Sequence, residues 1–483
     1  MRINVPTNHN FYEEKPLYEN STLATNRLKD RFGVRLAKEV ENVKSNLFSS
    51  TFEFTSKSKS LEQVQIFGFK NNRNKLEDDE QLILKLYSKE YPKEEKKYII
   101  QTGLFAGVLY HKGCQFNITT PYGQTFLNRM LNFINDVYID NQEAKASKSK
   151  DTNEFQNIIA YLFIQALEKA SVMGLPKVYQ TQTQRSHKVR GKIDVNAYLK
   201  HDFPFQGKLT TSFREQVYVQ EIIDVLYLAC KKLEQSFGKE IHRKIHGIYQ
   251  LLKQNYSGIY TQLTTIEKAK NHSVLQNPMF GAFKSVLKYA EIILKDQSLE
   301  TLDNKDNLAT TGYLFDISQL FEVYLEKLLS RHFSDWYVTG QEELNVYTDL
   351  FYGRKMFPDL VMRHKETNEI IVFDAKFKKM RSIKKDVDRS DFYQIHSYIQ
   401  YYQPNVLFGG LLFPFSQNID TVKAHSKSLF ANDNNTHSFI VDGIFIQKDM
   451  SMEDISVREN EFLSRIEELI AKFEISYDKL LIE

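Results

Sequence analysis

The spacing of apolar residues along the chain predicts both strands and helices in its first three hundred residues. Alternation of apolar and polar residues is typical of half-buried strands, whereas apolar residues three or four positions apart are typical of helices. Up to about residue 300, the predicted strands are 50–58, 98–123, 177–199 and 208–213, and the predicted helices are 21–43, 124–139, 154–174 and most of 214–300. A tight turn is expected at Lys112-Gly113. This part of the chain is therefore expected to be a mixed α/β region.

A different pattern begins near residue 305, behind the polar and turn-prone stretch "NKDNLATTGYLF" (304–315). The predicted helices there are 316–333, 390–402 and 456–481, and the predicted strands are 335–347, 357–363, 369–377, 406–415 and 437–449. Asp316 and Gln319 are placed as a capping pair for the first helix, and Ser456 and Glu459 as a capping box for the last. The C-terminal part is expected to be a sheet with helices between its strands.

These patterns divide the chain into three predicted segments. Residues 1–95 are polar and mixed with few clear periods, and are interpreted as an N-terminal extension. Residues 96–304 form a region of strands and long helices, and 305–483 form a C-terminal domain. The stretch 141–153 is small and polar without an apolar period, so it is either a linker or a mobile loop within a domain.

Composition limits the class of protein. With 42% hydrophobic residues among 483, sizeable cores can form, and the formal net charge of +3 means that any basic surface must be local. The only cysteines, Cys114 and Cys230, lie far apart, which offers no zinc spacing or disulfide framework and favours a reducing, cytoplasmic setting. Neither a signal-peptide core nor a membrane-spanning run is evident in the sequence.

The strand "IIVFDAKFKK" (370–379) carries an acid and a lysine in an otherwise apolar run. Residues two apart on a strand point to the same face, so Val372, Asp374 and Lys376 share one face. The side chains of the alternate residues from 371 to 377 share the other face and are expected to pack on a helix. The strand therefore presents a carboxylate and an ammonium group together.

A second acid precedes this strand in "MFPDLVM", where Asp359 follows Pro358. The intervening "RHKETNE" is typical of a hairpin turn, so the two strands should pair and bring Asp359 near Asp374. Adjacent carboxylates repel, and a hard cation such as Mg²⁺ removes that cost. A bound magnesium ion can polarise a phosphoryl oxygen, and Lys376 can orient water or stabilise charge. The pattern outlines a site for phosphodiester hydrolysis.

Two interpretations of the acid and lysine remain open on the residues alone. A D-x-K triplet is common and usually marks a solvated strand face. The Pro-Asp pair one hairpin earlier favours the catalytic interpretation, as does Glu322, which lies within the apolar stripe of the preceding helix. An unpaired acid in that stripe would be costly, so Glu322 is a candidate third acid.

These segments resemble a known superfamily. "PDLVM" (358–362) followed by "IIVFDAKFK" (370–378) resembles the PD-(D/E)xK nucleases, and "DFYQIHSYIQYY" is similar to the Q-x3-Y helix of one branch, with Gln394 and Tyr398 in the motif places. The wider arrangement resembles McrC-like nuclease subunits of McrBC-type restriction systems. It includes "TGLFAGVL" (102–109), "VRGKIDV" (189–195) and "LFEVYLEKLL" (320–329), and covers roughly residues 95 to 415.

The resemblance implies an α+β chain whose mixed N-terminal region precedes a PD-(D/E)xK nuclease domain with a central mixed sheet flanked by helices. It implies a DNA endonuclease that cuts double-stranded DNA as the partner of a McrB-like AAA+ GTPase ring. The N-terminal region would dock on that ring and stimulate its hydrolysis. Independently, the chain contains no G-x-x-x-x-G-K-[ST] loop, so a motor would have to be another chain.

The resemblance also assigns roles to single residues. Asp359, Asp374 and Lys376 take the catalytic positions, Glu322 the helix acid and Gln394 the motif glutamine. Magnesium would be the cofactor, held by Asp359, Asp374 and Glu322. No small-molecule substrate and no membrane are expected.

Several alternatives stay open. The chain could be a non-cleaving adaptor or activator of the ring, or a nuclease that acts alone in DNA repair. The basic cluster over 376–385 could track phosphates or form a solvated loop, and that at 185–192 could contact DNA, the partner or only solvent. His242 and His246 have metal-binding spacing but lack an apparent third ligand.

Overall fold

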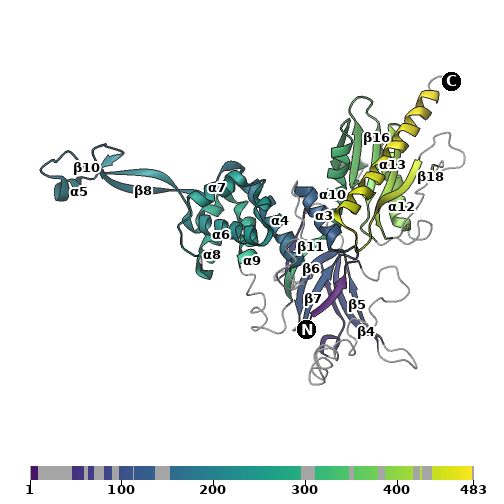
Figure 1. Cartoon of the computed structure of the whole chain (residues 1–483), viewed down its shortest axis with the longest axis horizontal. Coiled ribbons are helices and arrows are strands. Elements are labelled where there is room, and N and C mark those ends of the chain that lie inside the picture. The colour runs from purple at the N-terminus through teal and green to yellow at the C-terminus, as the bar shows by residue number, and fades with distance from the viewer. Residues whose placement is uncertain are drawn as a thin grey trace. The chain divides into compact units, whose positions relative to one another are not determined.

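The computed structural model groups the chain into two compact units (Figure 1). The first combines Met1–Asp136 with Asp303–Glu483, and the second is Val137–Leu302. The structure describes residues 2–8, 46–58, 64–69, 81–89, 97–112, 114–135, 153–260, 262–294, 310–346, 353–378, 387–416, 425–426 and 438–480. The helix predicted at 21–43 and almost all of the linker at 141–153 lie outside these residues.

Two sheets from the first part of the chain share one core in the first unit. A five-stranded sheet has the order β1-β7-β6-β11-β3, and a three-stranded sheet has the order β2-β4-β5. The strands are β1 (Arg2–Pro6), β2 (Phe52–Thr55), β3 (Val64–Phe67), β4 (Leu82–Lys89), β5 (Lys97–Thr102), β6 (Phe105–His111), β7 (Cys114–Thr119) and β11 (Thr311–Asp316). Leu109 and Phe116 of one sheet and Phe54 and Leu84 of the other lie in the same buried cluster. We call these two sheets the N-terminal sheets.

Strand β11 belongs to the N-terminal sheets although it follows them by almost two hundred residues. It pairs antiparallel with β6 and parallel with β3. The sequence division placed β11 in the segment 305–483 and residues 96–136 in the segment 96–304. In the structure, residues 96–136 lie in the first unit together with β11, and the second unit begins only at Val137.

The second large sheet of the first unit has the order β12-β15-β16-β17-β19-β18. Its strands are β12 (Trp336–Gly340), β15 (Leu360–His364), β16 (Ile370–Ala375), β17 (Val406–Phe415), β18 (His425–Ser426) and β19 (Ser438–Phe445), with a small hairpin of β13 (Leu344–Val346) and β14 (Arg354–Met356). Neighbours β16, β17 and β19 run parallel, whereas β12, β15 and β16 are antiparallel. The expected mixed α+β organisation is therefore observed.

Helices cover both faces of this sheet. The main helices among the described residues of the first unit are α3 (Gln124–Asn135), α10 (Ile317–His332), α12 (Arg389–Tyr401) and α13 (Met452–Leu480). Val372 packs in one buried cluster with Ile395 and Ile399 of α12. On the other face, the Phe377 ring meets Phe321 of α10 at 5.5 Å, as expected for the alternate residues of that strand. All residues of β16 and β17 are buried, which is typical of parallel strands covered on both sides.

Helix capping differs from the prediction at the last helix. Helix α13 begins at Met452. The Ser451 backbone nitrogen donates to Asp454 Oδ2 at 3.1 Å, and the Asp454 backbone nitrogen donates to Ser451 Oγ at 3.1 Å, so the two residues cap the helix reciprocally. The predicted box at Ser456 and Glu459 was wrong because the earlier S-x-x-D pair already starts the helix. Glu459 is instead buried. Asp316 does cap α10, by accepting hydrogen bonds from the Ser318 and Gln319 backbone nitrogens.

The second unit is a group of helices with an arm, visible in Figure 1 as the ribbon that carries β8, β10 and α5, and the sheet of this arm has three strands in the order β8-β10-β9. Its main elements are α4 (Asn153–Ala170), β8 (Lys177–Ser186), β9 (Lys192–Ile193), β10 (Leu209–Tyr218), α6 (Gln220–Phe237), α7 (His246–Gln254), α8 (Leu263–Lys270) and α9 (Phe283–Leu294). Short turns are α5 (Val195–Ala197), η4 (Ser171–Met173), η5 (Tyr198–Asp202), η6 (Lys239–His242), η7 (Ser273–Gln276) and η8 (Pro278–Phe280). None of the helices in the described parts of the chain is long and apolar enough to cross a membrane.

The arm corrects two sequence predictions. Residues 214–218 were predicted to be helical, but they extend β10, whose ten residues all pair with β8. Continuous pairing across the ribbon outweighs the local apolar spacing there. The strand predicted over 177–199 ends at Ser186, and the chain then turns through β9, α5 and η5 before β10 returns.

Candidate active site

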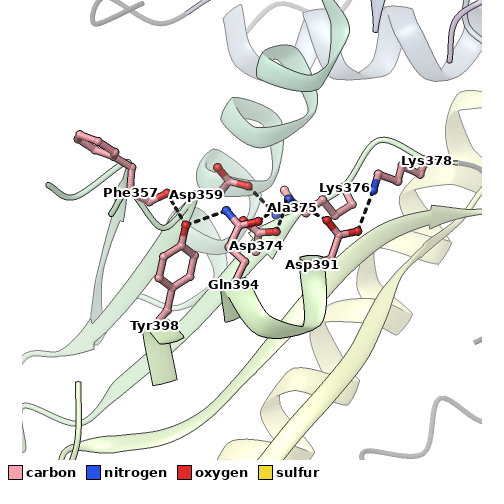
Figure 2. A network of polar contacts seen from close by, with 9 residues as sticks. All are labelled: Phe357, Asp359, Asp374, Ala375, Lys376, Lys378, Asp391, Gln394 and Tyr398. Atoms are coloured by element: carbon pink, nitrogen blue, oxygen red, sulfur yellow. Dashed lines mark hydrogen bonds and ion pairs between the residues drawn. The ribbon is translucent and has the colours of Figure 1, made fainter. Parts of the chain in front are cut away.

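The hairpin of β15 and β16 brings the two sequence-predicted aspartates together, as expected. Leu360 pairs with Phe373, which places Asp359 and Asp374 on neighbouring positions of adjacent strands. The Ala375 backbone nitrogen donates a hydrogen bond of 2.9 Å to Asp359 Oδ2. Figure 2 shows both carboxylates beside the Lys376 side chain. Strand pairing thus fixes the geometry of the acidic pair.

Asp374 is a buried carboxylate that pairs with a lysine but accepts no well-directed hydrogen bond from the residues that the structure describes. Its side chain is only 1% exposed, and neither oxygen accepts a well-directed hydrogen bond from the residues that the structure describes. The Lys376 ammonium is close, with Nζ 2.6 Å from Asp374 Oδ2. Burial and then the charge of Asp359 raise the pKa of Asp374 well above its ordinary value, and Lys376 only partly opposes this. Further positive charge would therefore stabilise the ionised site.

Lys376 sits among acceptors contributed by the strand and by α12. Its Nζ lies 3.6 Å from Asp391 Oδ1 and donates a hydrogen bond of 3.2 Å to Gln394 Oε1. Burial lowers the pKa of this lysine, but the surrounding carboxylates raise it by more, and the net pKa lies above its ordinary value. Lys376 is therefore protonated at neutral pH, so it can donate hydrogen bonds and stabilise negative charge but cannot accept a proton.

A chain of hydrogen bonds orients Gln394. Its Nε2 donates to the Tyr398 hydroxyl at 2.8 Å, and that hydroxyl donates to the Phe357 carbonyl at 3.1 Å (Figure 2). Burial raises the pKa of Tyr398, which keeps the hydroxyl protonated as a donor. Gln394 and Tyr398 are four residues apart on α12 and so lie on one face of the helix. This arrangement turns the Gln394 carbonyl oxygen toward Lys376.

Asp391 joins the site although sequence reasoning did not single it out. It is buried near the start of α12 and accepts a hydrogen bond of 2.8 Å from Lys378 Nζ. It therefore contacts both lysines that follow Asp374 in the strand. Its spacing of three residues from Gln394 and seven from Tyr398 places all three on one helical face, and that spacing was the available signal.

The structure does not gather Glu322 with the two aspartates. Glu322 is buried on α10, but the described residues contain no group of three or more acidic, histidine or cysteine side chains placed to hold a metal ion. One turn later on the same helix, Glu326 lies against Gly340, close to the Asp359 carbonyl. The expected trio of Asp359, Asp374 and Glu322 remains a prediction.

The other sequence candidates have structural partners or fall outside the described residues. His242 is buried, and its Nε2 lies 2.9 Å from the Cys230 carbonyl. In the basic cluster at 185–192, Arg185 pairs with the buried Asp202 at 2.6 Å. Residues 379–385 of the other basic cluster are not described.

Comparisons with known proteins add a family to this geometry. A model of the family described as "McrBC 5-methylcytosine restriction system component" matches residues 77–414, more than half of the chain. The chain belongs to the McrBC family. This membership confirms the resemblance read from the sequence motifs. The matched residues contain Glu322, both aspartates, Lys376 and Gln394.

Two solved structures similar to this McrBC family member both come from Thermococcus gammatolerans. One is a refined half-complex from a tetradecameric assembly of McrB AAA+ hexamers with bound McrC, at 13% identity and a TM-score of 0.44. That comparison covers 96% of this chain and 100% of the other. The second is a cryo-electron microscopy structure of the McrBC complex, at 12% identity and a TM-score of 0.28, covering 69% of this chain and 88% of the other. No curated protein matches.

Proposed function

We propose that this McrBC family member is the DNA-cleaving subunit of a restriction system. The observation that carries the proposal is the buried Asp374 carboxylate, paired with Asp359 and Lys376 and lacking well-directed hydrogen bonds from the described residues. Such a group is costly to a folded chain unless a cation or a reacting group completes it. The reaction proposed is hydrolysis of a DNA phosphodiester bond in double-stranded DNA.

The residues present fit a magnesium ion. Carboxylate oxygens are the ligands that magnesium prefers, and neither Asp374 oxygen accepts a well-directed hydrogen bond from the described residues, although Oδ2 lies 2.6 Å from the Lys376 ammonium. We propose that Asp359 and Asp374 hold the ion, with Glu322 as the third acid. When bound, it would supply Lewis-acid polarisation of the phosphate and lower the pKa of a bound water.

The remaining side chains have roles that follow from their own contacts. Protonated Lys376 can donate a hydrogen bond to an oxygen on which negative charge develops. Gln394 fixes the direction of that ammonium group, and its own orientation is held by Tyr398. Asp391 holds Lys378 beside the site, where a second ammonium group can contact the DNA backbone.

The order of elements supports assignment to the PD-(D/E)xK class. Helix α10 precedes the antiparallel strands β12, β15 and β16, and α12 then connects β16 to the parallel strand β17. The Pro-Asp pair precedes β15, the D-x-K triplet ends β16, and the Q-x3-Y pair lies on α12. The motif residues meet at one end of the sheet, which is the feature that favours this assignment over a coincidental triplet.

We propose that cleavage depends on a McrB-like AAA+ GTPase ring whose hydrolysis this chain stimulates. Family membership in a restriction system supports a shared task, and because this sequence contains no P-loop motif, the ring is proposed as the source of nucleotide hydrolysis. We propose that the ring binds the tip of the arm, which is the stretch between β8 and β10. This tip includes most of the basic cluster at 185–192 that the sequence analysis identified.

The arm tip has the properties of a preformed binding surface. Buried Asp202 anchors it, through Arg185 at 2.6 Å and the Thr210 backbone nitrogen at 2.8 Å. Around this anchor the tip exposes a set of large apolar side chains: Val189, Ile193, Val195, Leu199, Phe203 and Phe205. Exposed apolar groups at this density mark interaction sites rather than ordinary surface.

The test is cleavage of supercoiled plasmid, methylated or unmethylated, by the purified chain with its genomic AAA+ neighbour, magnesium and nucleotide. Wild-type protein should cut in a manner that depends on nucleotide and magnesium, and Asp374→Ala should not cut. Stimulated hydrolysis without cutting would instead support the non-cleaving adaptor. Efficient cutting without the ring would support the nuclease that acts alone.

A further inference from the structure

We propose that Tyr122, which belongs to the N-terminal part of the chain, is a positioning residue for DNA cleavage. It would hold the backbone that immediately follows Lys376, and thereby set where the lysine ammonium points. This inference rests on the proposed nuclease function. It adds a residue from outside the nuclease motifs, more than two hundred positions earlier in the sequence.

The Tyr122 hydroxyl binds the ends of two neighbouring strands of the nuclease sheet. Tyr122 lies in the turn between β7 and α3 and is buried. Its hydroxyl is 2.9 Å from the Pro414 carbonyl, at the end of β17, and 3.0 Å from the Lys378 carbonyl, just beyond β16. A hydroxyl has one proton, so the two carbonyls share a single donor. Burial raises the pKa of Tyr122, which keeps that proton in place.

The aromatic ring of Tyr122 supports the residue between the two lysines. It meets the Phe377 ring edge-on at a centroid distance of 5.4 Å. Phe377 is buried and also contacts Phe321 of α10. Asn8, next to β1, places its Nδ2 3.5 Å from the Phe377 carbonyl. Two separate segments of the N-terminal part thus reach the same stretch of backbone.

The turn that carries Tyr122 has little freedom to move. Gly123 has a φ of +87°, and a Cβ there would come within 2.5 Å of the Lys448 carbonyl oxygen. A glycine is needed because the turn approaches that backbone so closely. The tyrosine is therefore presented to the end of β16 by a backbone that is itself tightly packed.

The support from Tyr122 acts on the backbone around Lys376, whereas Asp374, Asp391 and Gln394 contact its ammonium group. The Lys376 backbone nitrogen donates to the Leu412 carbonyl at 2.8 Å, and the Lys378 nitrogen donates to the Lys376 carbonyl at 2.9 Å. Tyr122 and the Phe377 contacts add to these bonds and to the pairing of Lys378 with Asp391 in holding the strand end. Small displacements of a reacting group can lower turnover strongly, because catalysis requires close alignment.

The test compares Tyr122→Phe with the matched variant Tyr324→Phe. Both changes remove one buried hydroxyl, from a contact between the N-terminal part and the nuclease sheet in Tyr122→Phe and from a contact between two helices beside that sheet in Tyr324→Phe. Tyr324 donates instead to Glu459 of α13 and packs on Phe126 of α3. We measure kcat and KM for plasmid cleavage with the partner ring, stimulation of the ring, and the melting temperature of each variant.

Tyr122→Phe should lower kcat on the order of tenfold, with KM for DNA and ring stimulation unchanged. Tyr324→Phe should lower the melting temperature by a similar amount and leave kcat unchanged. Equal kcat in wild type and Tyr122→Phe, or an equal loss in both variants, overturns the positioning role. Wild-type cutting no better than that of Asp374→Ala would overturn the proposed function, and the positioning role with it.

Discussion

At the scale of single residues, Asp374 is where stability and proposed function oppose each other. A buried carboxylate without well-directed donors in the described structure lowers the free energy of unfolding, because ionisation inside the protein is costly. Folding raises its pKa, so the folded chain binds this proton more tightly than the unfolded chain. The contribution of this proton to the free energy of unfolding is therefore fully present below the pKa that Asp374 has in the unfolded chain. It is lost as the pH rises through the higher pKa of the folded chain.

Asp374→Asn tests this opposition directly. The variant should lose cleavage by about a hundredfold or more, because it removes the charge that a magnesium ion and Lys376 require. Its melting temperature in chelator should equal or exceed that of wild type at neutral pH, and the difference should shrink as the pH is lowered. Thermal melts from acidic to neutral pH measure both effects. A clear loss of stability at neutral pH would show that Asp374 is a structural residue.

Asp391 offers a second test at this scale, with a control on the same helix. Asp391→Asn should lower cleavage on the order of tenfold, because Lys376 and Lys378 lose the charge that holds them. Asp388→Asn changes an acid three residues earlier whose side chain makes no capping hydrogen bond, and should leave the rate unchanged. Similar losses of cleavage rate in the two variants would show that the changes disturb the helix and not the positions of the lysines.

At the scale of elements, local patterns predicted the hairpin and the helix that carry the candidate site better than they predicted the elements around them. The hairpin of β15 and β16 follows from alternation and a polar turn within some fifteen residues, and α12 follows from its apolar spacing. The pairing of β11 with β6 joins residues two hundred apart, and no local pattern encodes such a partner. The contact between Tyr122 and the end of β16 was not predicted because its partners are also far apart in the sequence. Asp391 could have been found from its spacing to Gln394 and Tyr398 on one helical face, but it belongs to no motif.

Helix α10 carries two acids, Glu322 and Glu326, that can be compared as candidates for the third acid of the site. Glu322→Gln should slow cleavage on the order of tenfold and raise the magnesium concentration needed for half-maximal rate, if Glu322 completes the site. Glu326→Gln, one turn later and against Gly340, should leave the magnesium requirement unchanged. Magnesium titrations of the cleavage rate distinguish the two. The opposite result would transfer the role of third acid to Glu326.

At the scale of the whole molecule, the two units suggest how the chain divides its work. The second unit, Val137–Leu302, is one continuous segment that interrupts the first. A fragment that ends near residue 300 would therefore lack β11, which lies between β6 and β3 in the five-stranded sheet. Such a fragment would expose the edge of β6 and lose part of the core of the N-terminal sheets. A fragment for testing the second unit should therefore begin and end at the boundaries of that unit.

The isolated segment 137–302 should fold, stimulate nucleotide hydrolysis by the partner ring and cut no DNA. Its helices have a buried core of their own, including Leu226, Phe283 and Leu287, and it carries the whole arm. Replacing the exposed Phe203 at the arm tip by Asp should abolish stimulation, because the charge would be buried against the partner, whereas the same change at exposed Lys208 should not. Circular dichroism checks folding, and titration of the ring measures hydrolysis. A folded fragment that fails to stimulate, while the chain lacking 137–302 still does, would assign docking to the first unit.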